Sequence, residues 1–510
     1  MTGAETSLRS KAVHGAAWSA MSSIILRLGS FAVGIVLARV LAPEQFGVYA
    51  VALTVQSILM TVADLGLSAD LVRSKEPEKI APTIATLGLV SGATTTAVTM
   101  AVSVPLASLL GSREAAPAIA VLSLTLVLGS ISLVPYSILL RNFRQRALFL
   151  VGAVDFVIST SVTLVLVFAG FGVLGLALGR VAAQVVSSTM QFFLARVTPR
   201  YGLDRTRLRP ILGFGLPIAA ANLLAWGLMN IDNVILAHVA GTTALGFYVL
   251  AFNISGWPMN ALSQSVRSIS LPYFSRAGNG ATALGVVVAV GWAGGLLAGG
   301  LLAALSGPLI SVVYGDKWMP AAPVLAALGL FGAVRVVFDV FTGYLYASGN
   351  ATSVLWIQIL WLVGLVGSMV LVTPVYGIVG AAWVHLVIAV VVILPAYLVV
   401  LHRSGAHRRE VLGRSVWPTA AAVPAIAVAL LTRHLIEGSV AALLVGGFAA
   451  VGVFAVLVWP WARRQLALFR EPGSGQDGTG VAATEPEPLA AMAPITVPER
   501  EADLGRVGHG

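Results

Sequence analysis

The sequence consists mainly of apolar stretches that follow one another with short polar segments between them. Most of these stretches reach the length of about 20 predominantly apolar residues that a helix needs to cross a bilayer. Only 10% of the residues are charged, whereas a soluble globular domain carries about 25%. Because such a chain cannot present a charged surface to water on all sides, the sequence predicts an integral membrane protein.

Fourteen stretches are apolar and long enough to be membrane spans, which predicts an all-α polytopic membrane protein with fourteen transmembrane helices. The expected spans are 15–38, 46–68, 83–110, 117–139, 148–169, 172–195, 211–237, 244–269, 281–305, 321–347, 353–373, 377–401, 416–432 and 440–461. Arg27 interrupts the first apolar run and no small-residue cleavage site follows it. We therefore expect a retained first helix rather than a removed signal peptide.

The distribution of lysine and arginine predicts how the helices are oriented. If the N-terminus is cytoplasmic, 24 of the 31 basic residues fall in segments on the cytoplasmic side and only four in segments on the outer side. Cytoplasmic loops carry such an excess of basic residues. We therefore expect a multi-pass protein of the cytoplasmic (inner) membrane with both termini in the cytoplasm. The net charge of +10 comes from these loops, so nucleic acid is not an expected partner.

Several kinds of chemistry are excluded by what the sequence lacks. It contains no cysteine, which rules out disulfides, thiolate nucleophiles and zinc–thiolate sites. It has no HExxH motif, no P-loop and no glycine-rich nucleotide fingerprint, and no large segment separates the spans. We therefore expect no metal, no cofactor and no enzymatic activity. Residues 463–510 are rich in Pro, Gly and Glu and are expected to form a disordered cytoplasmic tail.

An internal repeat predicts the architecture. The segment 36–52 recurs as 235–251, with Leu, Ala, Val, Gly, Tyr and Ala at equivalent places. The segment 172–177 recurs in a similar way as 377–382. Six spans separate the copies, and an even number preserves their direction, so the repeat is parallel, with its axis along the membrane normal. We expect a cytoplasmic N-terminus (1–14), two parallel six-helix lobes (15–200 and 201–405) and two C-terminal helices (406–462).

The repeated segments also resemble a known family. Residues 38–49, Ala-Arg-Val-Leu-Ala-Pro-Glu-Gln-Phe-Gly-Val-Tyr, resemble the first-hairpin signature of bacterial polysaccharide transporters. Residues 213–217, Gly-Phe-Gly-Leu-Pro, together with Asp232 and the later Gly-Phe-Tyr at 246–248, resemble their second-half signature. These transporters are the lipid-linked oligosaccharide flippases of the multidrug/oligosaccharidyl-lipid/polysaccharide exporter superfamily. The resemblance spans about residues 10–460, and departs from the family pattern at Ala237 and His238.

The resemblance implies a flippase that moves a polyprenyl-diphosphate-linked oligosaccharide across the membrane by alternating access. Such a flippase serves the biosynthesis of cell-surface polysaccharides such as lipopolysaccharide or exopolysaccharide. Its partners would be the lipid-linked oligosaccharide, a polysaccharide polymerase and export machinery. Two other functions of the same superfamily remain open, a peptidoglycan-precursor flippase and a cation-coupled drug antiporter. A membrane glycosyltransferase or polymerase is the alternative from another class.

Four residues are candidates for binding the substrate. Arg27 lies in the middle of the first span, where a charge costs at least about 2.5 kcal/mol and needs a partner or a polar cavity. Arginine offers fixed donors to a diphosphate, and a buried ion pair with Asp232 is the alternative role. Asp232 in the seventh span, Asn253 in the eighth and Arg267 at its cytoplasmic end complete the candidate set.

Acidic residues inside the spans are candidates for ion coupling. Asp64 in the second span and Asp232 are the two candidates for this role, and the alternative for Asp64, near the cytoplasmic side, is an interfacial position or a pairing with basic loops. Asp155 is expected to be interfacial or paired with basic loops. Arg180 and His385 stand toward the outer ends of their spans, where we expect their side chains to reach the interface.

Overall fold

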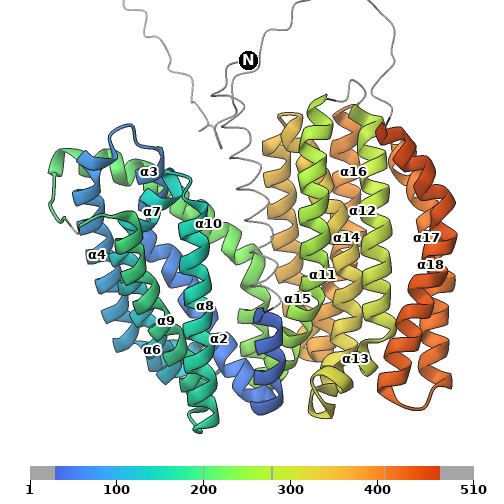
Figure 1. Cartoon of the computed structure of the whole chain (residues 1–510), viewed down its shortest axis with the longest axis horizontal. Helices are drawn as coiled ribbons and strands as arrows, with labels where there is room; N and C mark the ends of the chain where they lie inside the picture. The colour runs from blue at the N-terminus through green and yellow to red at the C-terminus, as the bar shows by residue number, and fades with distance from the viewer. Residues whose placement is uncertain (1–28, 199, 277–279, 407, 471–510) are drawn as a thin grey trace, which may run out of the picture.

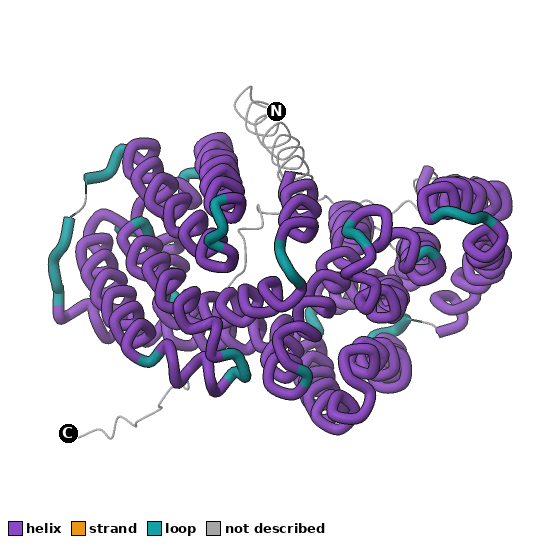
Figure 2. Tube along the Cα trace, turned by 90° about the horizontal axis from the view of Figure 1, so that it is seen from below, coloured by secondary structure: helices purple, strands orange, loops and turns teal. Residues whose placement is uncertain are grey.

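The computed structural model describes residues 29–198, 200–276, 280–406 and 408–470. Every regular element within these ranges is a helix, and Figure 2 shows no strand among them. Eleven of the helices are long and apolar enough to cross a membrane. The prediction of an all-helical, multi-pass membrane protein is therefore confirmed.

The count of fourteen spans stays a prediction. One of the eleven stretches, Ala351–Arg403, is 53 residues long and covers two of the expected spans. Most of the first expected span lies outside the described residues, and only Gly29–Val40 of it is seen, as a helix. Gly377 has left-handed backbone angles, with φ of 58°, inside the long stretch. The backbone therefore turns at the boundary that the sequence predicts between the eleventh and twelfth spans.

The helices follow the chain in two series. The first series is α2 (Pro43–Asp64), α3 (Leu67–Arg73), α4 (Pro77–Ala101), α5 (Ser103–Leu109), α6 (Ala116–Ile131), α7 (Leu133–Arg141), α8 (Gln145–Phe168) and α9 (Gly172–Ala195). The second is α10 (Arg205–Val239), α11 (Gly241–Arg276), α12 (Gly280–Ala304), α13 (Ser306–Val313), α14 (Ala322–Ala347), α15 (Ala351–Ile388), α16 (Leu394–Arg403), α17 (Arg408–Leu435) and α18 (Ser439–Arg470). Short 3-10 helices cover Arg113–Ala115 and Asp316–Ala321, and a π-helix covers Ala389–Ile393.

The two series form two groups in space. In Figure 1, α3–α9 make up the group on the left and α11–α18 the group on the right, while α2 and α10 run between them. The groups lie close together at the lower edge of this view and diverge toward the upper edge. We call the lower edge the closed end of the molecule. The first turns of α2 and α11, which carry the repeated segments, meet there.

The core of the second group surrounds α14, the most enclosed of the apolar helices. Trp318, Tyr248, Phe341 and Tyr397 are among the largest side chains that are fully buried there. Aromatic rings pack edge-on and stacked around Phe338, which lies 5.2 Å from the Tyr397 ring and 5.5 Å from the Trp361 ring, centroid to centroid. A close-packed core of this kind resists deformation.

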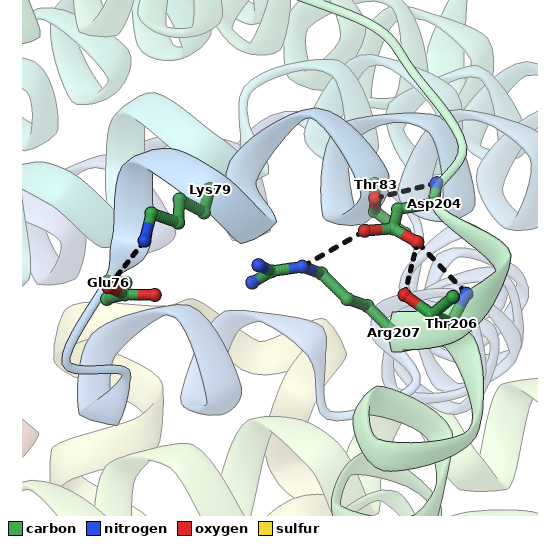
Figure 3. Close-up of polar contacts among 6 residues, drawn as sticks. All are labelled: Glu76, Lys79, Thr83, Asp204, Thr206 and Arg207. Atoms are coloured by element: carbon green, nitrogen blue, oxygen red, sulfur yellow. Dashed lines mark hydrogen bonds and ion pairs between the residues drawn. The ribbon is translucent and has the colours of Figure 1, made fainter.

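The segment that joins the two groups is attached to α4 (Figure 3). The backbone N–H of Asp204 donates to Thr83 Oγ1 over 3.2 Å, and the N–H of Gly202 donates to Thr86 Oγ1 over 3.0 Å. Asp204 also caps α10, because its carboxylate accepts hydrogen bonds from the backbone N–H of Thr206 and from Arg207 Nε. The first turn of α10 is thus held to the first group, although the rest of this helix leads to the second.

Candidate functional site

Three buried polar side chains meet where α10 packs against α11 and α15 of the second group. The hydroxyl of Tyr248 on α11 donates to Asp232 Oδ2 on α10 over 2.9 Å. The same hydroxyl lies 2.9 Å from Nε2 of His385 on α15, and that nitrogen lies 3.7 Å from Asp232 Oδ2. We call Asp232, Tyr248 and His385 the buried triad.

The triad is enclosed by protein on all sides. Asp232 is 3% exposed, Tyr248 0% and His385 5%. The second carboxylate oxygen of Asp232 accepts from the backbone N–H of Asn233 over 2.9 Å, and the Phe331 ring covers His385 at a centroid distance of 5.1 Å. The Nδ1 atom of His385 has no hydrogen-bond partner among the described residues.

The triad has the chemistry of a proton or cation site. A carboxylate is costly to bury unless a proton, a cation or hydrogen bonds compensate its charge. Here one hydroxyl and one N–H compensate it in part, while the adjacent imidazole can accept or release a proton. Binding or release of a proton or a small cation would therefore change the charge of the buried triad.

The expectation that His385 reaches the interface is wrong. It is 5% exposed because α10, α11 and α14 pack around it, and Tyr248 occupies its Nε2 atom. Asp232 and Tyr248 lie in one segment that resembles the family signature, but nothing in that segment predicts that they pair. Asp232 and Tyr248 are 16 residues apart, and this spacing alone does not predict a contact. They meet because α10 and α11 fold back on each other.

Asn253 lies in a different environment from Asp232. It is exposed on α11, one turn before Trp257, whose ring lies 4.8 Å from that of Phe31 in the helix 29–40. The exposed face of α11 that carries Asn253 is thus next to the first helix. Arg27 falls outside the described residues. Arg267 lies in α11, but its side chain also falls outside them.

Asp64 is half-buried at the end of α2. Its Oδ2 atom accepts a hydrogen bond from Ser68 Oγ over 3.0 Å, and its side chain lines a pocket of about 320 Å³ inside the first group. Asp155 on α8 pairs with Arg180 on α9, with 3.1 Å between Oδ2 and Nη1. The expected pairing of Asp155 with basic loops is therefore replaced by a contact between two membrane helices.

Five hydrogen bonds join the two halves of the chain at the closed end. Arg39 donates through Nε to the Val313 carbonyl over 3.0 Å and through Nη2 to the Val312 carbonyl over 2.6 Å. Lys317 Nζ donates to the carbonyls of Arg39 and Leu41, each over 2.9 Å. Trp318 Nε1 donates to the Ala38 carbonyl over 2.8 Å. We call these the closing contacts of Arg39, Lys317 and Trp318.

The protein has two groups of membrane helices that meet at one end, and an ionisable cluster is buried where α10 packs against the second group. These features define a multi-pass protein of the transporter type. The chain belongs to the polysaccharide biosynthesis protein family, whose model matches residues 36–323. The resemblance to bacterial polysaccharide transporters is thereby confirmed.

Two relatives match most of the chain. The succinoglycan biosynthesis transport protein ExoT of Rhizobium meliloti (strain 1021) is 25% identical over 460 residues, covering 86% of this chain and 91% of ExoT. The lipopolysaccharide biosynthesis protein WzxC of Escherichia coli (strain K12) is 24% identical over 453 residues, covering 85% and 90%. Among solved structures, lipid II flippase MurJ in an inward closed conformation matches with a TM-score of 0.73 at 12% identity, covering 88% of this chain and 99% of MurJ.

Proposed function

We propose that the protein is a flippase that moves a polyprenyl-diphosphate-linked oligosaccharide across the cytoplasmic membrane by alternating access, for cell-surface polysaccharide biosynthesis. The observation that carries this proposal is membership of the polysaccharide biosynthesis family together with relatives aligned over about 90% of their length. One of those relatives is named as a transport protein and both are named for polysaccharide biosynthesis. The protein acts as a transporter and not as an enzyme.

The architecture that we propose has fourteen spans, in two parallel lobes (15–200 and 201–405) with two further helices (406–462). The closed end is the outer side of the membrane, and both termini are cytoplasmic. The four basic residues expected outside are Arg39, Arg113, Lys317 and Arg433, and three of them support this orientation by their contacts. Arg39 and Lys317 make closing contacts, and Arg433 donates to the Ala304 carbonyl beside α13. The form described here is accordingly closed to the outside.

In this proposal, Asp232 couples transport to an ion gradient and does not contact the substrate. Its burial with Tyr248 and His385 keeps it from a bulky head group but allows a proton or small cation to bind. We assign coupling to Asp232 rather than Asp64, because Asp64 lines an open pocket. Arg27 binds the diphosphate, Arg267 receives it at the cytoplasmic side, and Asn253 contacts the sugars from the exposed face of α11.

The test is transport by the purified protein in proteoliposomes. A fluorescent polyprenyl-diphosphate oligosaccharide should become accessible to a membrane-impermeant reagent only when the protein is present. Lipid II, the peptidoglycan precursor, serves as the rival substrate, since MurJ shares the fold. Faster movement of lipid II than of the oligosaccharide would favour the rival flippase. Movement of neither lipid would overturn both.

A further inference from the structure

The first group of helices contains a polar pocket that the proposed function has not used. It lies between α2, α3, α6, α7 and α9 and has a volume of about 320 Å³. Its polar lining comes from Asp64, Ser68, Ser130, Ser132, Tyr136, Gln184 and Gln191. Tyr136 stands at an accessible position, since it is 43% exposed, whereas Ser130 is 6% exposed. The pocket therefore runs from an open mouth to a buried floor.

Gln191 marks this pocket as a place for a ligand. The side chain is 7% exposed, and its Oε1 atom accepts no hydrogen bond from any described residue. Native structures leave few buried acceptors without a donor, because water cannot replace the missing hydrogen bond. A ligand with an O–H or N–H group inside the pocket would supply the donor.

The other polar groups of the pocket show which ligands fit. Asp64 offers carboxylate oxygens, of which one accepts from Ser68, and Gln184 donates to Ser188 Oγ over 3.0 Å. None of the described residues that line the pocket is Lys, Arg or His, so it lacks the cations that a diphosphate requires. Carboxylate, amide and hydroxyl groups together match a ligand that carries several hydroxyls.

The size of the pocket argues against a bare metal ion. Mg²⁺ or Ca²⁺ needs about six oxygen ligands within about 2.0–2.6 Å, which is a much smaller space. Pockets that hold small organic molecules begin at about 300 Å³. The volume of about 320 Å³ therefore fits one small molecule of the size of a monosaccharide.

We propose that this pocket binds one sugar residue of the lipid-linked head group. Asp64 and Gln191 Oε1 accept hydrogen bonds from its hydroxyls, and Tyr136 borders the mouth. This inference rests on the proposed flippase function and names a specificity site for it. A sugar can reach the pocket through this mouth, because Tyr136 is 43% exposed.

The experiment compares lipids that differ only in the sugar. Four probes are used: bare polyprenyl diphosphate, and the same lipid carrying a single glucose, galactose or N-acetylglucosamine. The protein contains no cysteine, so a single Tyr136→Cys substitution reports on the mouth of the pocket through its rate of maleimide labelling. Tyr346→Cys, at a position that is 56% exposed in the second group, is the control.

We expect at least one sugar-bearing lipid to slow labelling at position 136 by fivefold or more relative to the bare lipid, and none to change labelling at position 346. In transport assays, Asp64→Asn and Gln191→Leu should each reduce the preference for that lipid over bare lipid by about fivefold to tenfold, the effect of one lost hydrogen bond. Gln56→Leu is the matched control, since Gln56 bonds Thr125 Oγ1 outside the pocket and should leave the preference unchanged.

Equal labelling with all four probes, or unchanged preference in both variants, would overturn the sugar site. Loss of ion-gradient dependence in Asp64→Asn with the sugar preference intact would instead assign Asp64 to coupling and also overturn it. Transport of none of the lipids by the unmodified protein, including the oligosaccharide used above, would overturn the flippase function itself. The two failures are thus separable.

Discussion

Gly47 and Gly246 occupy equivalent places in the two repeats, and each lies against a backbone carbonyl of the other half. A Cβ at Gly47 would overlap the Thr242 carbonyl oxygen, and a Cβ at Gly246 would overlap the Pro43 carbonyl oxygen. Pro43 and Thr242 are themselves separated by the repeat interval of 199 residues. The contact is reciprocal, as expected of two related units packed around a two-fold axis. It brings α2 and α11 together at the closed end.

Closure of this end therefore depends on the absence of side chains at the two glycines. We expect Gly47→Ala and Gly246→Ala each to lower stability by about 1–3 kcal/mol, because the added methyl group overpacks the contact. Thermal unfolding in detergent measures this. Gly34→Ala is the control, since no atom lies within 4 Å of a Cβ at that position. A loss in the control as large as in the two variants would contradict the prediction.

The closing contacts should control access from the outer side. In a Leu41→Cys background, position 41 is buried at 2% exposure and should react slowly with an impermeant thiol reagent in intact cells. Adding Lys317→Met removes the donor to the Arg39 and Leu41 carbonyls. We expect this loss to destabilise the closed form by about 1.4 kcal/mol, which corresponds to a factor of about ten in its equilibrium. The rate of labelling at position 41 should therefore rise by about tenfold.

The same assay tests the orientation. A cysteine at the exposed position Glu437 should be labelled in intact cells, and one at Phe143, which is 83% exposed, should not. Labelling at position 143 and protection at position 437 would show that the closed end faces the cytoplasm.

Asp232→Asn should separate coupling from substrate movement. The amide keeps the size of the side chain and can still accept the Tyr248 hydrogen bond, so the protein should fold. Loss of the ionisable group should reduce gradient-driven transport at least about tenfold while leaving exchange without a gradient nearly unchanged. Imposed proton and sodium gradients are tested in parallel. Asp155→Asn, which removes a partly exposed ion pair, is the matched control and should retain coupling.

Arg27 should be required for binding the diphosphate. We expect Arg27→Ala to abolish transport in proteoliposomes with little loss of stability, and Arg27→Lys to restore part of it, because lysine keeps the charge but not the two-pronged donor geometry. If Arg27 is instead a buried ion-pair partner, its removal should cost about 3–5 kcal/mol of stability. Full transport by a stable Arg27→Ala protein would exclude the ligand role.

The cap of α10 should make stability depend on pH. Hydrogen bonds from Thr206 and then Arg207 hold the pKa of Asp204 below its ordinary value of 3.8. The folded state therefore binds this proton less readily than the unfolded state, and the stabilisation is present at neutral pH and lost as the pH falls. The difference in melting temperature between the unmodified protein and Asp204→Ala should be full at pH 7 and shrink below about pH 4. An unchanged difference at pH 3 would contradict this.

The partners of the charged residues inside the spans could not be predicted from the sequence. Asp232 could be selected as a residue that needs a partner, because an acidic side chain in an apolar span is costly. Its partner Tyr248 is polar only at one atom, and His385 follows 153 residues later, so nothing local links the three. Arg180 and Asp155 are each unusual as charged residues inside apolar spans, but they pair only because α8 packs against α9.

The sequence by itself determined that the chain crosses the membrane many times, that two of its segments recur in its second half, and which loops carry positive charge. These properties depend on local apolar length, on recurring residues and on lysine and arginine counts, all of which are present before folding. Only the tertiary structure decided which side of each helix faces the protein. Lipid-facing and protein-facing sides are both apolar in a membrane helix, so periodicity does not distinguish them. The buried triad, the closing contacts and the pocket at Gln191 all depend on which side of each helix faces the protein.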